Sequence, residues 1–364
     1  MKILIVAGGT GGHLFPGIAL AEEFTIKDKI TEILFVGTKR GLEQRMLSRE
    51  GFPFELIDAS PLRGKGVRKL PEFLINSIKG ILQSIMIIKR FHPDLVIGLG
   101  GYTSAPVMVA ASLMGTKTAL HEQNVLPGLA NRVLGKIVRL MFVSFEDSRS
   151  YFPKAKTILT GNPIRRRCVH LHPSPLPPTP FALLVLGGSL GSSQINRAMI
   201  DALPHLIAVR DTISIIHHTG DQDLNAVNEA YRREGFSAEV VPFIDEMAGA
   251  YQRAHLVICR AGATTLAELT LHHKASLLIP YPLATDHHQH LNAKVLVNRG
   301  AAQMIDPEQL TGATLAQRIL HFYHHPEQLT EMGSNAGALA RPRAAQAIVE
   351  HCYKLVKGEQ CLSR

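Results

Sequence analysis

A histidine at the end of a glycine-rich turn is the first feature of this chain that points to chemistry. The turn reads GGTGGH at 8–13 and follows a short apolar run at 2–7. Glycines let the backbone approach a ligand closely, and the N-terminus of a following helix attracts an anion. The dinucleotide pattern G-x-G-x-x-G needs no histidine, and an imidazole titrates near neutral pH. We therefore expect anion binding and proton transfer at this turn.

Two further glycine-rich turns follow apolar runs later in the chain. They read GLGGYTS at 98–104 and GGSLGS at 187–192. One such turn is common in α/β domains, where it closes a tight connection. Three of them predict several loops that bind phosphates, on one substrate or on two.

A carboxylate follows a fourth turn, made of small residues. The segment CRAGATTLAEL at 259–269 has the pattern of a strand end, a turn and a helix start. Glu268 can accept two hydrogen bonds from ribose hydroxyls, as acidic residues do in nucleotide-binding α/β domains. The alternative is a carboxylate that complements the helix dipole.

These turns require strands and helices that bring them together. Apolar runs alternate with helical patterns, the first helix being expected at 16–23, and this order predicts parallel sheets with right-handed crossovers. Ligands bind beyond the carboxyl ends of such strands, where the turns lie. Besides 2–7 and the run that opens at Phe181, the expected strands are 31–37, 95–99, 117–120, 140–144, 214–218, 238–241, 256–259 and 276–280.

The length of the chain predicts two domains. Its 364 residues exceed the size at which one hydrophobic core keeps growing, and 168–180 holds five prolines in thirteen residues, typical of a stiff connector. The strand, glycine turn and helix then begin again. We expect two doubly wound α/β domains facing a cleft, 1–163 and 164–340, with a C-terminal helix at 341–364 completing the first.

Composition indicates a reduced, cytoplasmic protein. The four cysteines form no C-x-x-C pair and follow no zinc-ligand spacing, and no signal peptide precedes the glycines. No window approaches the ~20 apolar residues that span a bilayer. If a membrane is involved, the protein is expected to lie on it.

The net charge of +9 belongs mostly to the first half of the chain. Residues 1–163 hold 21 Lys and Arg against 13 Asp and Glu, whereas 164–364 hold 18 against 17. In 61–90, basic residues bracket an apolar core, a pattern that suits an anionic membrane surface. The alternative is a packed helix with solvated ends. Nucleic acid is not expected, because aromatic residues are scarce and no binding motif accompanies the charge.

Nine motifs follow one another along the chain: GGTGGH at 8–13, GLGGYTSAP at 98–106, HEQN at 121–124, TGNPIR at 160–165, GGSLGS at 187–192, HHTG at 217–220, PFIDEM at 242–247, CRAGATTLAEL at 259–269 and PYPLATDHHQHLNA at 280–293. Together they resemble the MurG family, the N-acetylglucosaminyltransferases of peptidoglycan synthesis. The resemblance covers nearly the whole chain. It implies a GT-B fold that transfers N-acetylglucosamine from UDP-N-acetylglucosamine to lipid I, giving lipid II, without a cofactor.

The resemblance also implies which residues hold the donor. Ser189 contacts the diphosphate, Glu268 takes the ribose hydroxyls, the backbone of Ile244 binds the uracil, and Gln289 with Asn292 holds the sugar. The small-residue turn joins Ser189 at the diphosphate, through Ala263, Thr264, Thr265, Leu266 and Ala267.

Arg165 and four residues of the first half complete this implied set. Arg165 faces the nucleotide, and Thr10, Gly11, Gly12 and Asn124 approach the donor from the opposite wall. The partners implied are the two substrates, an anionic inner membrane surface and other enzymes of cell-wall synthesis. The expected location is the cytoplasmic face of the bacterial inner membrane, as a peripheral protein.

The reaction needs a general base on the acceptor side. The 4-hydroxyl of the acceptor attacks the anomeric carbon opposite the departing UDP, which inverts that centre. His13 is the first candidate for the base, with His121, Glu122 and Tyr102 as alternatives.

One motif departs from the family pattern. The segment DHHQH at 286–290 has His288 where the family has a glutamine, which affects one sugar or nucleotide contact. The same histidines suggest a metal site, but they lack the spacing of metal ligands, and no metal is expected.

Rival functions share some of these features. A glycolipid synthase or a UDP-sugar epimerase would share the glycine turns and the ribose carboxylate, and would differ in HEQN and GGYTSAP. A nicotinamide-dependent oxidoreductase would need the dinucleotide fingerprint with its downstream acidic residue, which do not occur together here.

Overall fold

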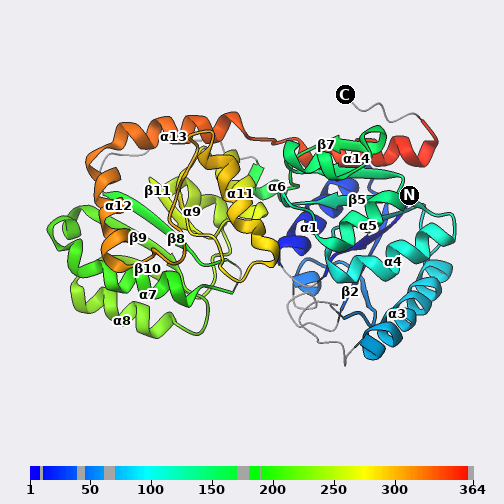
Figure 1. Ribbon diagram of the computed structural model, residues 1–364, viewed down its shortest axis with the longest axis horizontal. Helices are drawn as coiled ribbons and strands as arrows, with labels where there is room; N and C mark the ends of the chain where they lie inside the picture. Colours follow the sequence, from blue (N-terminus) through cyan, green and yellow to red (C-terminus); the bar gives the residue numbers. More distant parts are fainter. Residues whose placement is uncertain (9–10, 39–45, 61–69, 170–179, 189, 360–364) are drawn as a thin grey trace. The chain divides into compact units, whose positions relative to one another are not determined.

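The protein forms two compact units. In this computed structural model, residues 1–8, 11–38, 46–60, 70–169, 180–188 and 190–359 are described. Unit 1 is Met1–Arg166 with Pro342–Arg364, and unit 2 is Arg167–Arg341 (Figure 1). The short helix α6, Arg166–Val169, lies where the chain passes from one unit to the other. Each unit is an α/β fold around one parallel sheet, as the alternation of apolar runs and helical patterns predicts.

The sheet of unit 1 has seven parallel strands in the order β3-β2-β1-β4-β5-β6-β7. β1 is an inner strand and pairs with both β2 and β4. Its apolar run is buried because helices cover both faces of the sheet. The strands are β1 Lys2–Val6, β2 Glu32–Gly37, β3 Phe54–Leu56, β4 Leu95–Gly98, β5 Lys117–Glu122, β6 Leu140–Val143 and β7 Thr157–Leu159.

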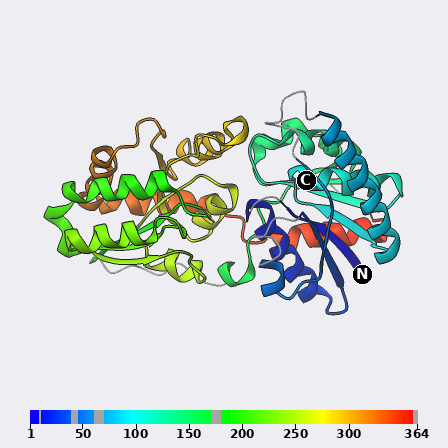
Figure 2. The ribbon, with the colours of Figure 1, turned by 90° about the horizontal axis from the view of Figure 1, so that it is seen from below.

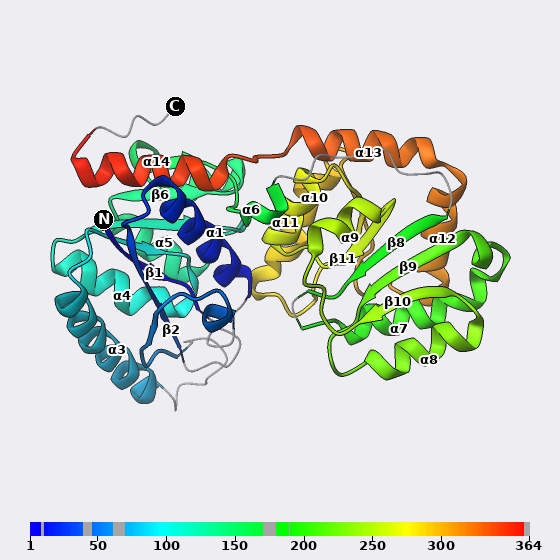
Figure 3. The same cartoon turned by 180° about the vertical axis from the view of Figure 1, so that it is seen from behind.

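Two groups of helices cover this sheet. Helices α1 and α14 pack together on one face, and Figure 3 shows them side by side although they lie at opposite ends of the chain. Helices α3, α4 and α5 contribute to the core on the other face. The bounds are α1 Gly11–Lys27, α3 Leu70–Phe91, α4 Gly101–Leu113, α5 Leu129–Ile137 and α14 Ala344–Lys357, with 3-10 helices at Glu146–Tyr151 and Lys154–Lys156.

Helix α14 is part of the core of unit 1. Ile348, Val349 and Cys352 are buried in the same apolar cluster as Phe24 of α1. The ring of Tyr353 lies 6.1 Å from that of Phe24. The C-terminal helix therefore completes the hydrophobic face of unit 1.

The sheet of unit 2 has six parallel strands in the order β10-β9-β8-β11-β12-β13. Its central strand β8 is buried along its whole length. The strands are β8 Phe181–Leu186, β9 Ile213–His218, β10 Ser237–Val241, β11 Leu256–Cys259, β12 Ala275–Leu278 and β13 Gln303–Met304.

Helices α7, α8, α12 and α13 share one apolar core with these strands. Figure 2 shows the same two units from below. The helices of unit 2 are α7 Ser193–Ala202, α8 Leu224–Glu234, α9 Met247–Arg253, α10 Ala263–Leu271, α11 His288–Val297, α12 Gly312–His324 and α13 Pro326–Ala338, with 3-10 helices at Leu203–His205, Ile207–Thr212 and Thr285–His287.

The first helix differs from its prediction. It was expected at 16–23, but α1 begins at Gly11, so His13 lies in its first turn. The first amide groups of a helix have no intrahelical acceptor, so glycines are tolerated there. Pro16 has no N–H group to donate to the carbonyl of Gly12, four residues earlier. Gly12 is exposed to solvent, so water can reach this carbonyl.

None of the helices among the described residues combines the length and apolar character needed to cross a membrane.

Candidate active site

In unit 1, three turns meet around His13. They follow β1, β4 and β5, which are neighbours in the sheet, so their carboxyl ends lie at one edge. Gly100 and Gly101 have positive φ angles of 88° and 75°, and a Cβ on either would lie 3.4 Å from the His13 ring. The glycine turn at 98–104 therefore provides a close backbone surface for this imidazole.

Gln123 connects His13 to the end of β4. Its Oε1 lies 3.2 Å from His13 Nδ1, and its Nε2 donates to the Leu99 carbonyl at 2.7 Å. The side chain is buried. Gln123 belongs to the HEQN motif but is not among the site residues predicted from the sequence. Its signal was its place directly after a buried strand and beside two titratable residues.

Glu122 holds the loop that follows β5. Its carboxylate accepts hydrogen bonds from Asn124 N at 2.9 Å, Asn131 Nδ2 at 2.8 Å and Gly128 N at 3.3 Å, and also from the Asn124 side chain at 3.2 Å. Burial raises the pKa of this carboxyl, and the donors oppose that rise. Both carboxylate oxygens therefore accept hydrogen bonds that hold this loop.

His121 is buried in unit 1. Its Nε2 lies 3.1 Å from the Gly161 carbonyl and 3.4 Å from Ser144 Oγ. Burial lowers the pKa of His121 to about 4; the Gly161 carbonyl opposes this shift, and nearby His13 adds to it. The ring is therefore neutral at pH 7.

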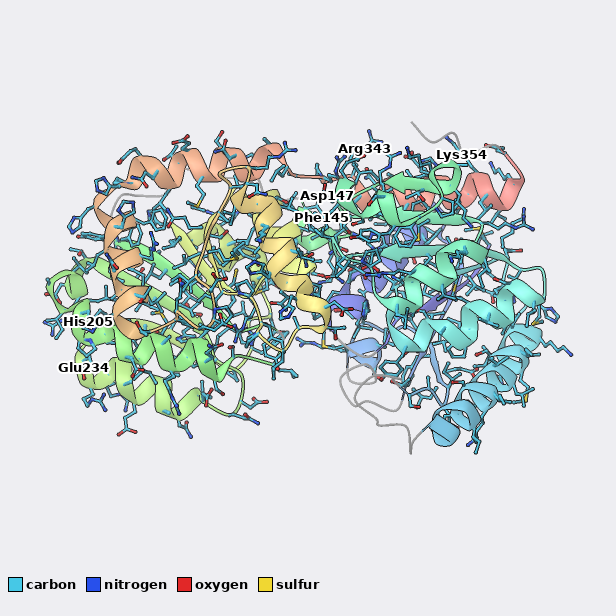
Figure 4. The ribbon with its side chains drawn as sticks, in the orientation of Figure 1. Phe145, Asp147, His205, Glu234, Arg343 and Lys354 are labelled. Atoms are coloured by element: carbon cyan, nitrogen blue, oxygen red, sulfur yellow. The ribbon has the colours of Figure 1, made fainter. Side chains whose placement is uncertain are left out.

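A 3-10 helix supports the same loop from the side of β6. Phe145 and Asp147, labelled in Figure 4, lie at the beginning of Glu146–Tyr151. Within it, Ser148 Oγ donates to the Asn124 carbonyl at 2.9 Å. The loop that carries Asn124 is thus held from two sides.

The other predicted residues of unit 1 lie at separate places. Gly11 and Gly12 are the first residues of α1, Tyr102 is half-buried at the start of α4, and Thr10 lies outside the described residues.

Arg165 packs within unit 1. Its buried guanidinium lies over the ring of Phe15, with 4.7 Å to the ring centre, and 3.9 Å from the carboxylate of Glu50. Its contact with a nucleotide stays a prediction.

In unit 2, a buried arginine connects the turns after β8, β11 and β12. Arg260 donates to Ser192 Oγ at 2.8 Å and Gln194 Oε1 at 3.1 Å, and to the carbonyls of Ile279 at 3.2 Å and Pro280 at 3.0 Å. Arg260 is not among the site residues predicted from the sequence. Its signal was a cation placed directly after a buried strand.

The glycine turn after β8 is fixed by its neighbour. Gly191 has a φ of 79°, and a Cβ there would collide with the Thr219 carbonyl oxygen. Ser192 then caps α7 by accepting from Ile195 N at 3.4 Å. Ser189 lies outside the described residues.

Gln289 and Asn292 both bind the small-residue turn. Gln289 Oε1 accepts from Ala261 N at 3.2 Å and Tyr281 N at 2.9 Å, and Asn292 Nδ2 donates to the Ala261 carbonyl at 3.3 Å. His288, which departs from the family pattern, has its Nδ1 2.7 Å from the Thr285 carbonyl.

Helix α10 begins without a side-chain cap at Gly262. Its first amide groups and the positive end of its dipole suit an anion. Glu268 lies on the same helix, buried, and accepts from Tyr251 Oη at 3.0 Å. Burial raises the pKa of Glu268 to about 7, and the hydrogen bond from Tyr251 opposes the rise. The first five residues of α10 are the predicted set Ala263, Thr264, Thr265, Leu266 and Ala267.

Ile244 lies half-buried in the loop between β10 and α9. In that loop, Phe243 packs edge-on against His218. Within the described ranges, no cluster of three His, Cys, Asp or Glu side chains has the arrangement of a metal site.

Two Rossmann-like units, each built on one parallel sheet with glycine turns at the carboxyl ends of its strands, form the GT-B fold of many glycosyltransferases. Two family models match the chain: the glycosyltransferase family 28 N-terminal domain over residues 3–143 and its C-terminal domain over residues 182–348.

Comparison with similar proteins identifies the family within this class. The N-acetylmuramyl-(pentapeptide) pyrophosphoryl-undecaprenol N-acetylglucosamine transferase of Myxococcus xanthus is 50% identical over 98% of this chain and 93% of its own length. That of Geotalea uraniireducens is 46% identical over the full length of both. The crystal structure of Acinetobacter baumannii MurG superimposes with a TM-score of 0.78 at 30% identity, over 97% of this chain and 100% of that one. The chain belongs to the MurG family within glycosyltransferase family 28.

Proposed function

We propose that this protein transfers N-acetylglucosamine from UDP-N-acetylglucosamine to the 4-hydroxyl of N-acetylmuramic acid in lipid I, giving lipid II with inversion at the anomeric carbon. The relatives at up to 50% identity are named as transferases of this class. The observation that carries the proposal is the pair of sites: an imidazole held against two glycines in unit 1, and a buried carboxylate on a helix with an uncapped N-terminus in unit 2.

Unit 2 provides the groups that a UDP-sugar needs. Glu268 accepts the ribose hydroxyls, and the Ile244 backbone binds the uracil. Gln289 turns its oxygen toward two backbone amides, which makes its NH2 the end that can donate to the sugar. Asn292 completes this set beside it.

The departing diphosphate needs positive charge. The N-terminus of α10 supplies amide groups and a dipole, and the turn that carries Ser189 adds a hydroxyl. Arg260 adds a buried cation, whose attraction to an anion is screened less than that of a surface group. These groups stabilise the charge that develops as the bond to the anomeric carbon breaks.

Unit 1 provides the proton acceptor. His13 removes the proton of the 4-hydroxyl as that oxygen attacks. His121 is neutral and buried, and both oxygens of Glu122 bind their own loop, so His13 is the group of the three best placed to act as base.

A transfer assay tests the function. Wild-type protein with UDP-N-acetylglucosamine and a short-chain lipid I analogue is expected to form the disaccharide product and UDP. In a thermal-shift experiment, UDP should raise the melting temperature and NAD should not. Stabilisation by NAD with no sugar transfer would favour an oxidoreductase, and conversion of the donor without any acceptor would favour an epimerase.

We also propose that helix α3 rests on an anionic membrane surface. Its exposed apolar residues recur at intervals of three and four, which places them on one stripe: Ile75, Ile78, Leu82 and Met86, each more than half exposed. Exposed basic side chains accompany the stripe, among them Lys89 and Lys79, the latter 2.7 Å from the Asp58 carboxylate. An apolar stripe edged by cations is typical of helices that lie in a lipid interface. The basic residues Arg63, Lys65, Arg68 and Lys69 lie outside the described part of the chain.

Two variants test this surface. Replacing Ile78 and Leu82 with Ser should weaken binding to vesicles of any charge. Replacing Lys65, Arg68 and Lys69 with Gln should weaken binding to anionic vesicles by ~1 kcal/mol per charge, with the loss fading at high salt. Transfer to a water-soluble acceptor should barely change in either.

The control is Ile30→Ser, which removes an apolar residue that is 80% exposed beyond the end of α1. Vesicle flotation measures the result. If both variants and the control bind alike, the stripe is not the membrane surface.

A further inference from the structure

The direction of one hydrogen-bond chain determines where the proton of His13 lies. Gln123 Nε2 donates to the Leu99 carbonyl at 2.7 Å, and a carbonyl oxygen can only accept. The amide group of Gln123 therefore has one orientation, because the reverse orientation would place two acceptors against each other. Its oxygen is the atom that lies 3.2 Å from His13 Nδ1.

An amide oxygen also can only accept, so His13 must donate to it from Nδ1. A neutral imidazole carries one N–H, and the other nitrogen then has the lone pair. With the proton on Nδ1, the lone pair lies on Nε2. This nitrogen is on the side of the ring that faces Gly101, where a Cβ would come within 3.4 Å of it.

Two titratable residues, His121 and Glu122, lie next to Gln123 in the chain. His121 lies near enough to affect His13 electrostatically and is neutral at pH 7. The Glu122 carboxylate is bound by Asn124, Gly128 and Asn131. Gln123 itself is buried and uncharged, so it fixes the ring without adding the charge that a carboxylate partner would bring.

We propose that Gln123 is a positioning residue that holds His13 in the tautomer protonated at Nδ1, so that Nε2 accepts the proton of the attacking hydroxyl. Only one part of this proposal rests on the proposed function: that Nε2 accepts the proton of the attacking hydroxyl. The tautomer itself is a property of the protein without substrate, and it can be measured alone.

Nitrogen NMR measures the tautomer directly. In protein labelled with 15N-histidine at pH 8.5, the two ring nitrogens have different shifts according to which carries the proton. The chain has 18 histidines, and the signal that disappears in His13→Gln identifies residue 13. Wild-type protein should show Nδ1 protonated. An Nε2-protonated ring in the wild type would overturn the proposal whatever the variants do.

Two substitutions at Gln123 separate positioning from packing. Gln123→Met keeps the length of the side chain and removes both hydrogen bonds. It should give a mixture of tautomers and lower kcat about 10- to 100-fold, as loss of an orienting partner does elsewhere, with the donor KM unchanged. Gln123→Glu keeps an acceptor oxygen and should retain the Nδ1 signal and recover part of kcat.

The matched control is Gln83→Met. Gln83 is another glutamine of unit 1 that makes two hydrogen bonds, accepting from Asp58 N at 2.7 Å and donating to Asp58 Oδ2 at 3.1 Å. This variant should leave the His13 spectrum and kcat on a water-soluble acceptor as in wild type. An equal loss of kcat in the two Met variants would mean general destabilisation and would overturn the proposal.

The two proposals fail in different ways. If Gln123→Met alters the tautomer but His13→Gln keeps its kcat, the proton goes to another group and only the proposed base is wrong. If His13→Gln is inactive while Gln123→Met keeps both the spectrum and kcat, His13 stands as base and the role of Gln123 is wrong.

Discussion

His13→Gln should lower kcat by ~10²–10⁴ while donor binding stays near normal, because the interaction of a general base with its proton develops only in the transition state. His13→Ala should do the same. The measurement is a steady-state assay with both substrates varied, together with UDP affinity by calorimetry. His13 lies in the first turn of α1, where a shortened side chain disturbs little of the core.

The pH dependence of kcat provides a second test of His13. In the wild type, kcat should fall on acidification as the imidazole becomes protonated, and this acid limb should be missing from the variants. The matched control is His92→Gln, another histidine of unit 1, at the end of α3. A His13 variant with normal kcat and an unchanged acid limb would assign the base elsewhere. A normal kcat with a much higher acceptor KM would make His13 a binding residue for lipid I.

Glu268→Ala should raise the donor KM at least tenfold and leave the acceptor KM nearly unchanged. Loss of an acceptor that binds two hydroxyls costs ~1.5–3 kcal/mol, and 1.4 kcal/mol corresponds to about tenfold in affinity. Glu268→Gln, which keeps the shape of the side chain and its contact with Tyr251, should show a smaller loss. The control is Glu327→Ala, an exposed carboxylate in the first turn of α13 in the same unit.

Glu268 also predicts how donor binding depends on pH. Its pKa is raised to about 7, so the carboxylate that accepts the ribose hydroxyls is present above pH 7 and is lost as the pH falls through that value. UDP affinity should therefore rise between pH 6 and 8 and be level in Glu268→Gln. Calorimetry in buffers of different ionisation enthalpy should show proton release on UDP binding near pH 7. An unaltered donor KM in a folded Glu268→Ala protein would remove the assignment.

The inner strands and the edge strand β10 could be predicted from the sequence, and the three shortest edge strands could not. β1, β4 and β8 are buried on both faces, so each is a continuous apolar run bounded by glycine. β3, β7 and β13 have two or three residues each and lie at the ends of their sheets. Their strand conformation comes from pairing with a neighbour, which leaves no pattern in so short a segment.

The functional residues divide in a similar way. Turns of glycine and other small residues after apolar strands indicated the turn of His13 and the start of α10, because several such turns in one chain predict loops that bind phosphates. Gln123 and Arg260 act through partners distant in sequence: Leu99 for the first, Ser192 and Ile279 for the second. No spacing in the chain encodes those contacts, and only the sheet order brings them together.

Helix α14 has a consequence for how the protein is made. The ribosome synthesises residues 167–341 before it reaches α14, an interval of about 9–35 s at ~5–20 residues per second. Unit 2 is continuous in sequence and can close its core during this time. Unit 1 cannot close its core at this stage, because the apolar face of α1 around Phe24 packs against Ile348 and Cys352, which are synthesised later. The nascent chain therefore presents an open apolar face until its last helix emerges, and the first unit to begin synthesis is the last to be completed.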